Sequence, residues 1–296
     1  MITSLTRATP VLVQGITGRM GRAHTRNMRE FGTNIVAGVA TRADITEVDG
    51  IPVFTDCAAA VAATGAVASI AMVPPADVLR AVTEAVGAGI RLIVTIAEGV
   101  PVHDALHAGC IARAAGATWV GASTPGLAVP GEMKLGFLPN VSLLPGPLAL
   151  MSKSGTLSYE VGYRLAREGI GTSYWVGVGG DAVKGVRFAD LLTPFLESDR
   201  TKGIVLVGEV GGDEEEEFAD TLAQVNIRKP VYAIVAGKEA KEGVSMGHAG
   251  ALTYGETGTL VSKHARLRAA GAGVYASIEE LVAACVRDLG KDRSVG

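Results

Sequence analysis

Apolar residues recur along the chain in short runs, separated by glycine, proline and stretches of helical period. In the first part of the chain, these runs predict strands at residues 10–14, 34–39, 68–73, 92–96 and 118–120. The segments between them predict helices that begin near Arg22 and near Ala76, and one over 104–115. Strands and helices that alternate at this pace indicate βαβ units and a doubly wound parallel sheet.

A passage rich in glycine and proline, residues 121–146, interrupts the alternation. It contains STPG, PGE and LPGP, so we expect little regular structure there. After it the alternation resumes, with strands predicted at residues 148–151, 174–178, 203–207 and 231–235. The pattern therefore predicts an α/β protein with two tandem doubly wound domains, residues 1–122 and 123–296. In such sheets small ligands bind at the carboxyl ends of the strands.

Composition narrows the class of protein. The chain has 296 residues, of which 48% are hydrophobic, and its net charge is −3; no basic face for nucleic acid is expected. We expect no secretory signal in the N-terminal stretch, and no apolar run reaches the length of a membrane helix. The three cysteines lack a CxxC pair, which indicates free thiols in a reducing compartment. We expect a cytoplasmic protein that contacts neither membrane nor nucleic acid.

One charge run stands out, the four acids Glu214–Glu217. It follows a predicted strand and a pair of glycines. Carboxylates are favoured in the first turn of a helix, where the macrodipole is positive. We expect this run to form such a turn, exposed to solvent.

A glycine loop, residues 14–21 (QGITGRMG), joins the first predicted strand to the first predicted helix. Such a loop brings backbone N–H groups to a helix N-terminus, where a phosphate is stabilised. NADP and the nucleotide part of CoA both suit it, and a structural turn without a ligand is the third alternative. Arg42 stands where a dinucleotide site would have an acid, and it suits the 2′-phosphate of NADP or the 3′-phosphate of CoA.

Four of the five histidines have ordinary explanations, on predicted helices or at the surface. They are His24, His103, His107 and His264. The pair at 103 and 107 has the spacing of two metal ligands on one helix face, but no third ligand is evident nearby. We therefore predict no metal site on this chain.

His248 differs, because it lies among small residues in the loop SMGHAGAL. Large reactants could approach such an imidazole, and a neutral ring nitrogen can attack phosphorus. A loop histidine without a chemical role is the alternative. Glu209, at the carboxyl end of a predicted strand, could bind one ring nitrogen and fix the tautomer for attack by the other. A carboxylate at a helix terminus is the plainer explanation for Glu209.

A second phosphate cradle is predicted at residues 152–157, SKSGTL, which follow a strand and open a helix. Its hydroxyls and backbone amides would point outward at the helix N-terminus. This cradle, an orienting acid and an accessible histidine together make a coherent site for phosphoryl transfer.

The chain resembles the α subunit of succinyl-CoA synthetase, nearly from end to end. QGITGRMG is similar to the family's CoA loop QGFTGxQG, and TIAEGVP to TITEGIP. PGEMKLGFLP follows PGECKIGIxP, SKSGTLSYE follows SRSGTLTYE, and VGVGGD follows VGIGGD. GEVGGDEEEE matches GEIGGxxEEE, and MGHAGAL matches MGHAGAI.

The resemblance implies a Rossmann-like CoA-binding domain followed by a flavodoxin-like ligase domain. It implies a β subunit with a nucleotide-grasp fold, which binds ATP or GTP with Mg and makes an acyl phosphate from a carboxylic acid. His248 would take or return the phosphoryl group, and CoA would attack the acyl phosphate. The implied CoA contacts are Thr17, Gly18, Arg19, Met20, Ile96, Ala97 and Glu98, and Arg42 is added to them as a predicted substitute for a lysine of the family. The implied residues around the phosphohistidine are Glu209, Ser154, Gly155, Thr156 and, for the carboxylate substrate, Tyr159.

The chain departs from the family at two places. Where the family has TPGKGG, this chain has ATRADI, with Ala43 in place of the lysine that contacts CoA. Where the family has GPNCPG, Ser123 and Thr124 replace asparagine and cysteine. These changes leave the acid open between succinate and another carboxylic acid, such as a hydroxylated or branched dicarboxylate.

Two other functions remain open at this point. An NADP-dependent reductase would use the loop GITGRMG but would leave SMGHAGAL unexplained. A non-catalytic CoA-binding subunit would keep the fold without the chemistry, although both His248 and Glu209 are present. The nucleotide preference and the assembly, αβ or α2β2, are not determined by the sequence.

Overall fold

The computed structural model of the chain describes residues 1–226, 229–238, 248, 250–251 and 258–290. The chain divides into two compact units. Unit 1 comprises Met1–Ala128, Glu132–Phe137 and Val183–Val186, and unit 2 comprises Val129–Gly131, Leu138–Ala182 and Arg187–Gly296. The boundary between residues 122 and 123 stays a prediction. No helix among the described residues has the length and apolar character to span a membrane.

The first sheet is built from the first seven strands of the chain. They are β1 (Val11–Gln14), β2 (Ile35–Val39), β3 (Glu47–Val48), β4 (Ile51–Phe54), β5 (Ala68–Ala71), β6 (Leu92–Thr95) and β7 (Thr118–Val120). Their order is β3-β4-β2-β1-β5-β6-β7, and only the short β3 runs antiparallel to its neighbour. Without β3 this is the Rossmann order, which reverses direction between β1 and β5.

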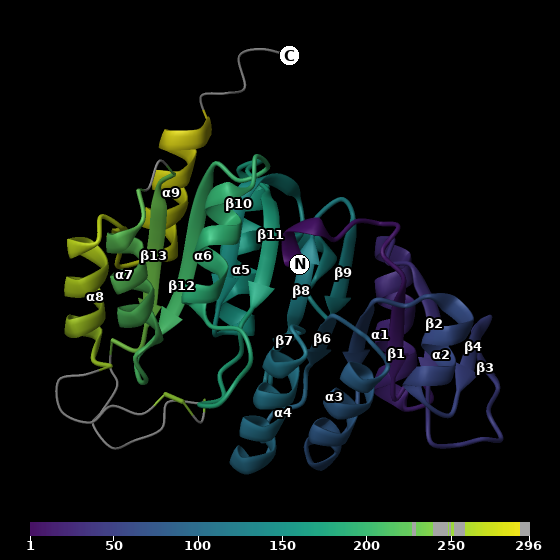
Figure 1. The fold of residues 1–296 in the computed structure, drawn as a ribbon. Coiled ribbons are helices and arrows are strands. Elements are labelled where there is room, and N and C mark those ends of the chain that lie inside the picture. Colours follow the sequence, from purple (N-terminus) through teal and green to yellow (C-terminus); the bar gives the residue numbers. More distant parts are fainter. Residues whose placement is uncertain (227–228, 239–247, 249, 252–257, 291–296) are drawn as a thin grey trace. The chain divides into compact units, whose positions relative to one another are not determined.

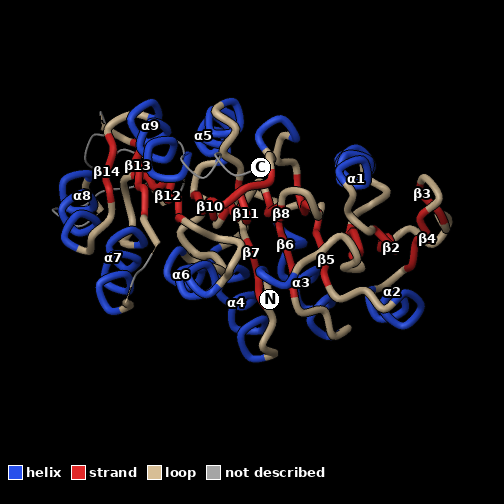
Figure 2. The backbone as a smooth tube through the Cα atoms, turned by 90° about the horizontal axis from the view of Figure 1, so that it is seen from above, coloured by secondary structure: helices blue, strands red, loops and turns tan. Residues whose placement is uncertain are grey.

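Helices cover both faces of the first sheet. They are α1 (Arg19–Phe31), α2 (Cys57–Thr64), α3 (Val78–Gly87) and α4 (Val102–Ala114). Helix α1 lies on one face and the other three lie on the opposite face (Figure 2). Strands β1, β5 and β6 are mostly apolar and are buried along their whole length, as expected for a sheet covered on both faces.

The second sheet also has seven strands. They are β8 (Gly126–Val129), β9 (Met133–Gly136), β10 (Pro145–Ser152), β11 (Thr172–Gly177), β12 (Gly203–Glu209), β13 (Val231–Ala236) and β14 (Gly273–Tyr275). Their order is β14-β13-β12-β10-β11-β8-β9. The five strands from β10 to β14 have the flavodoxin order, which reverses direction between β10 and β12.

The helices of unit 2 are labelled in Figure 1. They are α5 (Gly155–Arg167), α6 (Phe188–Glu197), α7 (Glu214–Gln224), α8 (Leu260–Ala269) and α9 (Ile278–Leu289). Helices α5 and α9 lie on one face of the sheet, and α6 and α7 lie on the other (Figure 2). Three short 3-10 helices complete the described elements of the chain, at Ile2–Ser4, Pro75–Asp77 and Asn140–Ser142.

The predicted α/β class with two parallel-dominated sheets is confirmed. The glycine-rich passage is the exception, because the prediction of sparse regular structure there is wrong. It forms β8 and β9, which are buried along their whole length. Between them Gly131 has a φ of 84°, a turn conformation that glycine adopts without strain. Short strands of this kind carry too few residues to show an alternating pattern.

Candidate active site

The site in unit 2 lies where the strand order of the second sheet reverses. Strands β10 and β12 are neighbours, and Ser152 pairs in register with Val207. The chain leaves β10 into α5 and leaves β12 into α7, so the loops after these strands meet at one edge of the sheet. In open α/β sheets this switch point is where ligands bind.

The predicted phosphate cradle lies at this switch point. Ser154 is the N-cap of α5, and its Oγ accepts a hydrogen bond of 3.3 Å from the N–H of Leu157. Gly155 and Thr156 open the helix, and Thr156 is exposed. The first N–H groups of a helix have no partner within the helix, so this end can accept an anion.

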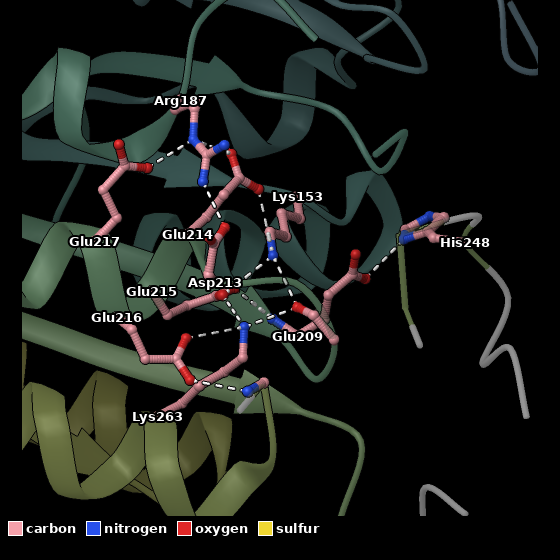
Figure 3. A network of polar contacts seen from close by, with 12 residues as sticks. Lys153, Arg187, Glu209, Asp213, Glu214, Glu215, Glu216, Glu217, His248 and Lys263 are labelled. Atoms are coloured by element: carbon pink, nitrogen blue, oxygen red, sulfur yellow. Dashed lines mark hydrogen bonds and ion pairs between the residues drawn. The ribbon is translucent and has the colours of Figure 1, made fainter. Parts of the chain in front are cut away.

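Glu209 is the last residue of β12, and its carboxylate contacts His248. The distance from Oε2 of Glu209 to Nδ1 of His248 is 2.7 Å (Figure 3). The carboxylate side chain is 10% exposed and the imidazole 28% exposed, so a reactant can reach the ring. Because the contact occupies Nδ1, a reaction at the imidazole would use Nε2.

Gly180 packs against the imidazole of His248. It belongs to the motif VGVGGD, which by itself predicts no separate role for this glycine. A Cβ added at Gly180 would lie 2.6 Å from Cγ of His248. The backbone nearby is also tied together: the N–H of Gly250 donates to the carbonyl of Gly180 over 3.1 Å. A residue without a side chain is therefore required beside the ring.

The acidic run at the start of α7 is buried, and the prediction that it is exposed is wrong for three of its four residues. Exposure is 5% for Glu214, 0% for Glu215 and 7% for Glu216. The run does form the first turn of a helix, as predicted. Its carboxylates are buried because two lysines from elsewhere in the chain, Lys153 and Lys263, lie among them (Figure 3).

Charge pairing explains how these acids tolerate burial. Burial by itself would raise the pKa of Glu215, but the ammonium groups of Lys153 and Lys263 hold it below its ordinary value. Burial would lower the pKa of Lys153, but the carboxylates of Glu215, Glu214 and Glu209 raise it instead. Loss of one partner from such a buried pair costs roughly 3–5 kcal/mol, because the other charge is left without compensation.

The glycine loop of unit 1 borders a cavity of about 240 Å³ at the switch point of the first sheet. Predicted CoA contacts Thr17 and Gly18 line it, together with residues that follow β2 and β5. Gly18 is the N-cap of α1 and has no side chain to cap that helix. Gly21 must lack a side chain, because a Cβ there would collide with the carbonyl oxygen of Gly15.

Other predicted CoA contacts lie outside the lining of this cavity. Arg19 and Met20 are exposed in the first turn of α1, and the segment Ile96–Glu98 follows β6. Arg42 forms an ion pair of 2.7 Å with Asp44 at the surface, where both side chains are 64% exposed. Among the described residues, Arg80 is the one lysine or arginine that lines the cavity, and it pairs with Asp77 over 3.0 Å.

The turn that departs from the family is tied to the predicted CoA segment. The N–H of Ser123 donates to the carbonyl of Ala97 over 2.8 Å. Thr124 is buried, and its Oγ1 accepts a hydrogen bond of 3.0 Å from the N–H of Gly126. Ser123 has a φ of 56°; asparagine adopts this left-handed conformation more readily than serine.

Tyr159 lies on α5, one turn beyond the phosphate cradle. Its ring centroid is 6.5 Å from that of the buried Trp175. Burial raises the pKa of Tyr159 to about 12, so the phenol is protonated at neutral pH and can donate a hydrogen bond.

The remaining histidines lie on helices, as expected. They are His24 on α1, His103 and His107 on α4, and His264 on α8. Within the described part of the chain, no group of three or more His, Cys, Asp or Glu side chains is arranged to hold a metal ion.

Each half of the chain contains a segment that matches a known protein family. Residues 6–99 match the family model described as a CoA binding domain, and residues 151–273 match the one described as CoA-ligase. The chain is 45% identical to the succinate–CoA ligase [ADP-forming] subunit alpha 2 of Archaeoglobus fulgidus, over 93% of this chain and 96% of that protein. The chain belongs to the succinate–CoA ligase α-subunit family. The Aquifex aeolicus subunit alpha is 42% identical, over 93% of this chain and 92% of that one.

Two solved structures have a fold similar to that of this chain. The ATP citrate lyase from Methanothrix soehngenii, in complex with citrate and coenzyme A, matches with a TM-score of 0.89 and 25% identity. The match covers 99% of this chain but only 52% of the lyase chain, so this chain spans about half of that protein. A dinucleotide-forming acetyl-coenzyme A synthetase of Ca. Korarchaeum cryptofilum matches with a TM-score of 0.78 at 22% identity, over 95% of this chain and 61% of that one.

Proposed function

We propose that the chain is the α subunit of a nucleotide-dependent acid–CoA ligase that carries a phosphoryl group on His248. The observation that carries the proposal is the contact of 2.7 Å between Glu209 and His248 at the switch point of the second sheet. The relatives named succinate–CoA ligase subunit alpha support the reaction class. An NADP-dependent reductase does not account for either the CoA-ligase match or the histidine site.

Glu209 and His248 act together in this reaction. The carboxylate of Glu209 accepts a hydrogen bond from the N–H at Nδ1 of His248, which fixes the tautomer and leaves the lone pair on Nε2. Nε2 forms the new bond to phosphorus as the bond from phosphorus to the donor oxygen breaks. In the second step a carboxylate oxygen of the acid forms the bond to phosphorus as the bond from phosphorus to Nε2 breaks, which gives the acyl phosphate and frees the imidazole. Throughout, Glu209 stabilises the positive charge that develops on the ring.

The phosphate cradle holds the transferred group. The N–H groups of Gly155 and Thr156, with the hydroxyl of Ser154, lie at the positive end of α5 and suit a dianionic phosphoryl group. Tyr159, one turn along the same helix, would donate its phenol proton to the carboxylate of the acid substrate. These roles are proposals for binding measurements to test.

A β subunit completes the enzyme in this proposal. The relatives are named as α subunits, so the nucleotide, ATP or GTP with Mg, would bind mainly to a partner with a nucleotide-grasp fold. CoA would bind to unit 1, where the cavity beside the glycine loop accepts a nucleotide phosphate at the N-terminus of α1. When bound there, CoA supplies the thiol that attacks the acyl phosphate.

Arg42 is expected to bind the 3′-phosphate of CoA, exchanging its surface partner Asp44 for the phosphate. The Arg42→Ala variant should raise the Kd for CoA about 10-fold and leave the Kd for 3′-dephospho-CoA unchanged. Isothermal titration calorimetry measures the Kd of both ligands for Arg42→Ala. It also measures them for Arg80→Ala, which removes a basic side chain that lines the cavity. The assignment to Arg42 would be contradicted if Arg42→Ala weakened binding of CoA and of 3′-dephospho-CoA equally. It would also be contradicted if only Arg80→Ala weakened binding of CoA selectively.

Gly180 should tolerate no side chain. The Gly180→Ala variant places a methyl group against the imidazole, and a displacement of about 1 Å at a reacting group lowers rates about 10²-fold. The matched control is Gly87→Ala at the end of α3, where a Cβ would meet nothing within 4 Å. We expect thioester formation by the complex with the β subunit to fall only in Gly180→Ala, with both variants still folded. A Gly180→Ala enzyme of full activity contradicts the packing argument.

The acid is tested with the chain and its β subunit purified together. A panel of carboxylic acids, including succinate and hydroxylated or branched dicarboxylates, is assayed for CoA-dependent nucleotide cleavage and for thioester. We expect one dicarboxylate to support both at equal rates. If the complex binds CoA tightly and no acid on the panel supports either reaction, a non-catalytic CoA-binding subunit becomes the better account.

A further inference from the structure

The buried charges at the start of α7 are more than a structural core, because they bond to the residue that orients His248. Oε1 of Glu215 accepts a hydrogen bond of 3.0 Å from the backbone N–H of Glu209. Gly208 allows this approach, since a Cβ there would lie 2.6 Å from the same carboxylate oxygen. Glu215 thus holds the backbone of Glu209 on one side, while the side chain of Glu209 reaches His248 on the other (Figure 3).

Two lysines complete this arrangement around Glu215. Its Oε2 accepts from Nζ of Lys153 over 3.1 Å and also from Nζ of Lys263. Both ammonium groups also contact the carbonyl of Gly211, over 3.5 Å from Lys153 and 2.8 Å from Lys263. Gly211 lies in the loop between Glu209 and α7, so the lysines fix this loop as well as the helix.

Lys153 connects this loop to the phosphate cradle. It lies between the end of β10 and Ser154, the N-cap of α5. Its side chain, 5% exposed, reaches Glu214 over 3.3 Å as well as Glu215. The N-termini of α5 and α7 are therefore held together by a side chain that starts beside the cradle and ends beside Glu209. Lys263, which is fully buried, adds α8 to the same cluster.

We propose that Glu215, Lys153 and Lys263 are positioning residues that act through Glu209. They hold the carboxylate of Glu209, the imidazole and the phosphate cradle in one geometry for phosphoryl transfer. The proposal rests on the proposed function of His248 and adds residues that have no contact with the reacting atoms. A group that reacts must be held to within a fraction of an ångström, and this support comes from buried hydrogen bonds behind it.

The test compares Lys153 variants in the complex with the β subunit. Rapid-quench labelling with γ-³²P-nucleotide gives the rate of phosphorylation, and titration gives the Kd for CoA. We expect Lys153→Met to label about 10²-fold more slowly, with a Kd for CoA within twofold because CoA binds to unit 1. Lys153→Arg keeps the charge but presents it in a larger planar group, so it should label faster than Lys153→Met.

The control variant is Asp220→Asn. It removes a surface ion pair between α7 and α8, with Arg266, that has no bond to Glu209 or Glu215. We expect it to lower thermal stability slightly and leave the labelling rate unchanged. Glu215→Gln is the second test variant, because it keeps the shape and the acceptor for the N–H of Glu209 while removing the charge that the lysines bind. If Lys153→Met does not fold, the labelling rate of Glu215→Gln tests the proposal instead. We expect this variant to label at least about 10-fold more slowly than the unmodified enzyme.

A double-mutant cycle separates positioning from general stability. If Lys153 acts through Glu209, Lys153→Met should cost little further rate in a Glu209→Gln background. Additive losses in the cycle, or folded Lys153→Met and Glu215→Gln enzymes that label at the full rate, overturn the proposal. Both results presuppose that the unmodified enzyme labels on His248. If it does not, the proposed function itself fails, which is a separate outcome.

Discussion

His248→Asn is expected to abolish phosphorylation of the chain and to lower thioester formation by about 10⁴-fold or more. The variant loses the nucleophile, and the amide of asparagine cannot carry a phosphoryl group. Asparagine still offers a hydrogen-bond donor to Glu209, so the surrounding structure has no new unpaired carboxylate. The measurement is a continuous assay of CoA-thioester formation by the complex with the β subunit, with labelling from γ-³²P-nucleotide in parallel.

The matched control is His107→Asn, a change at an exposed histidine on α4. It should retain full activity and full labelling. Labelling of the His248→Asn enzyme at the normal stoichiometry, or thioester formation within tenfold of the normal rate, would show that another residue carries the phosphoryl group.

Glu209→Gln should produce the second largest loss, about 10²- to 10⁴-fold in kcat. The amide oxygen can still accept from Nδ1 of His248, so the tautomer is retained, but the negative charge that stabilises the developing positive ring is lost. Glu209→Ala loses both the charge and the hydrogen bond, and should be slower still. The KM for CoA should stay within about twofold for both variants, because CoA binds to residues of unit 1 in our proposal.

Glu197→Gln, at an exposed position at the end of α6, is the control for loss of one carboxylate. Steady-state kinetics and single-turnover labelling of the three variants separate the effects. If Glu209→Gln keeps its full labelling rate, the carboxylate has no part in phosphoryl transfer. The 2.7 Å contact with His248 would then be a structural one.

Much of the fold was predictable because the core strands are continuous apolar runs. β1, β6 and β12 are buried along their full length, and their sequences VLVQ, LIVT and GIVLVGE are mostly apolar. The contact between Glu209 and His248 agrees with the expectation from the sequence, since Glu209 ends a strand beside the switch point. The catalytic roles of the two residues stay predictions until they are measured.

The buried acids show what one sequence does not reveal. A run of four carboxylates favours a solvent-exposed helix turn, and nothing local contradicts this. The two lysines that neutralise the buried charge of Glu215 are 62 and 48 positions away in the chain. Their pairing with Glu215 therefore depends on the tertiary fold. Gly180 was missed for the same reason, because its neighbour His248 is far away in sequence and only the packed structure shows the contact.

A rapid-quench experiment on the unmodified complex tests directly whether His248 carries the phosphoryl group. The chain and its β subunit are mixed with γ-³²P-nucleotide, quenched in base, digested and mapped by mass spectrometry. We predict one acid-labile phosphate per α chain on the peptide that contains His248, formed at least as fast as steady-state turnover. Addition of the acid and CoA should discharge it into thioester and free phosphate. Thioester formation without phosphate on His248, or phosphate that forms more slowly than turnover, would contradict the account.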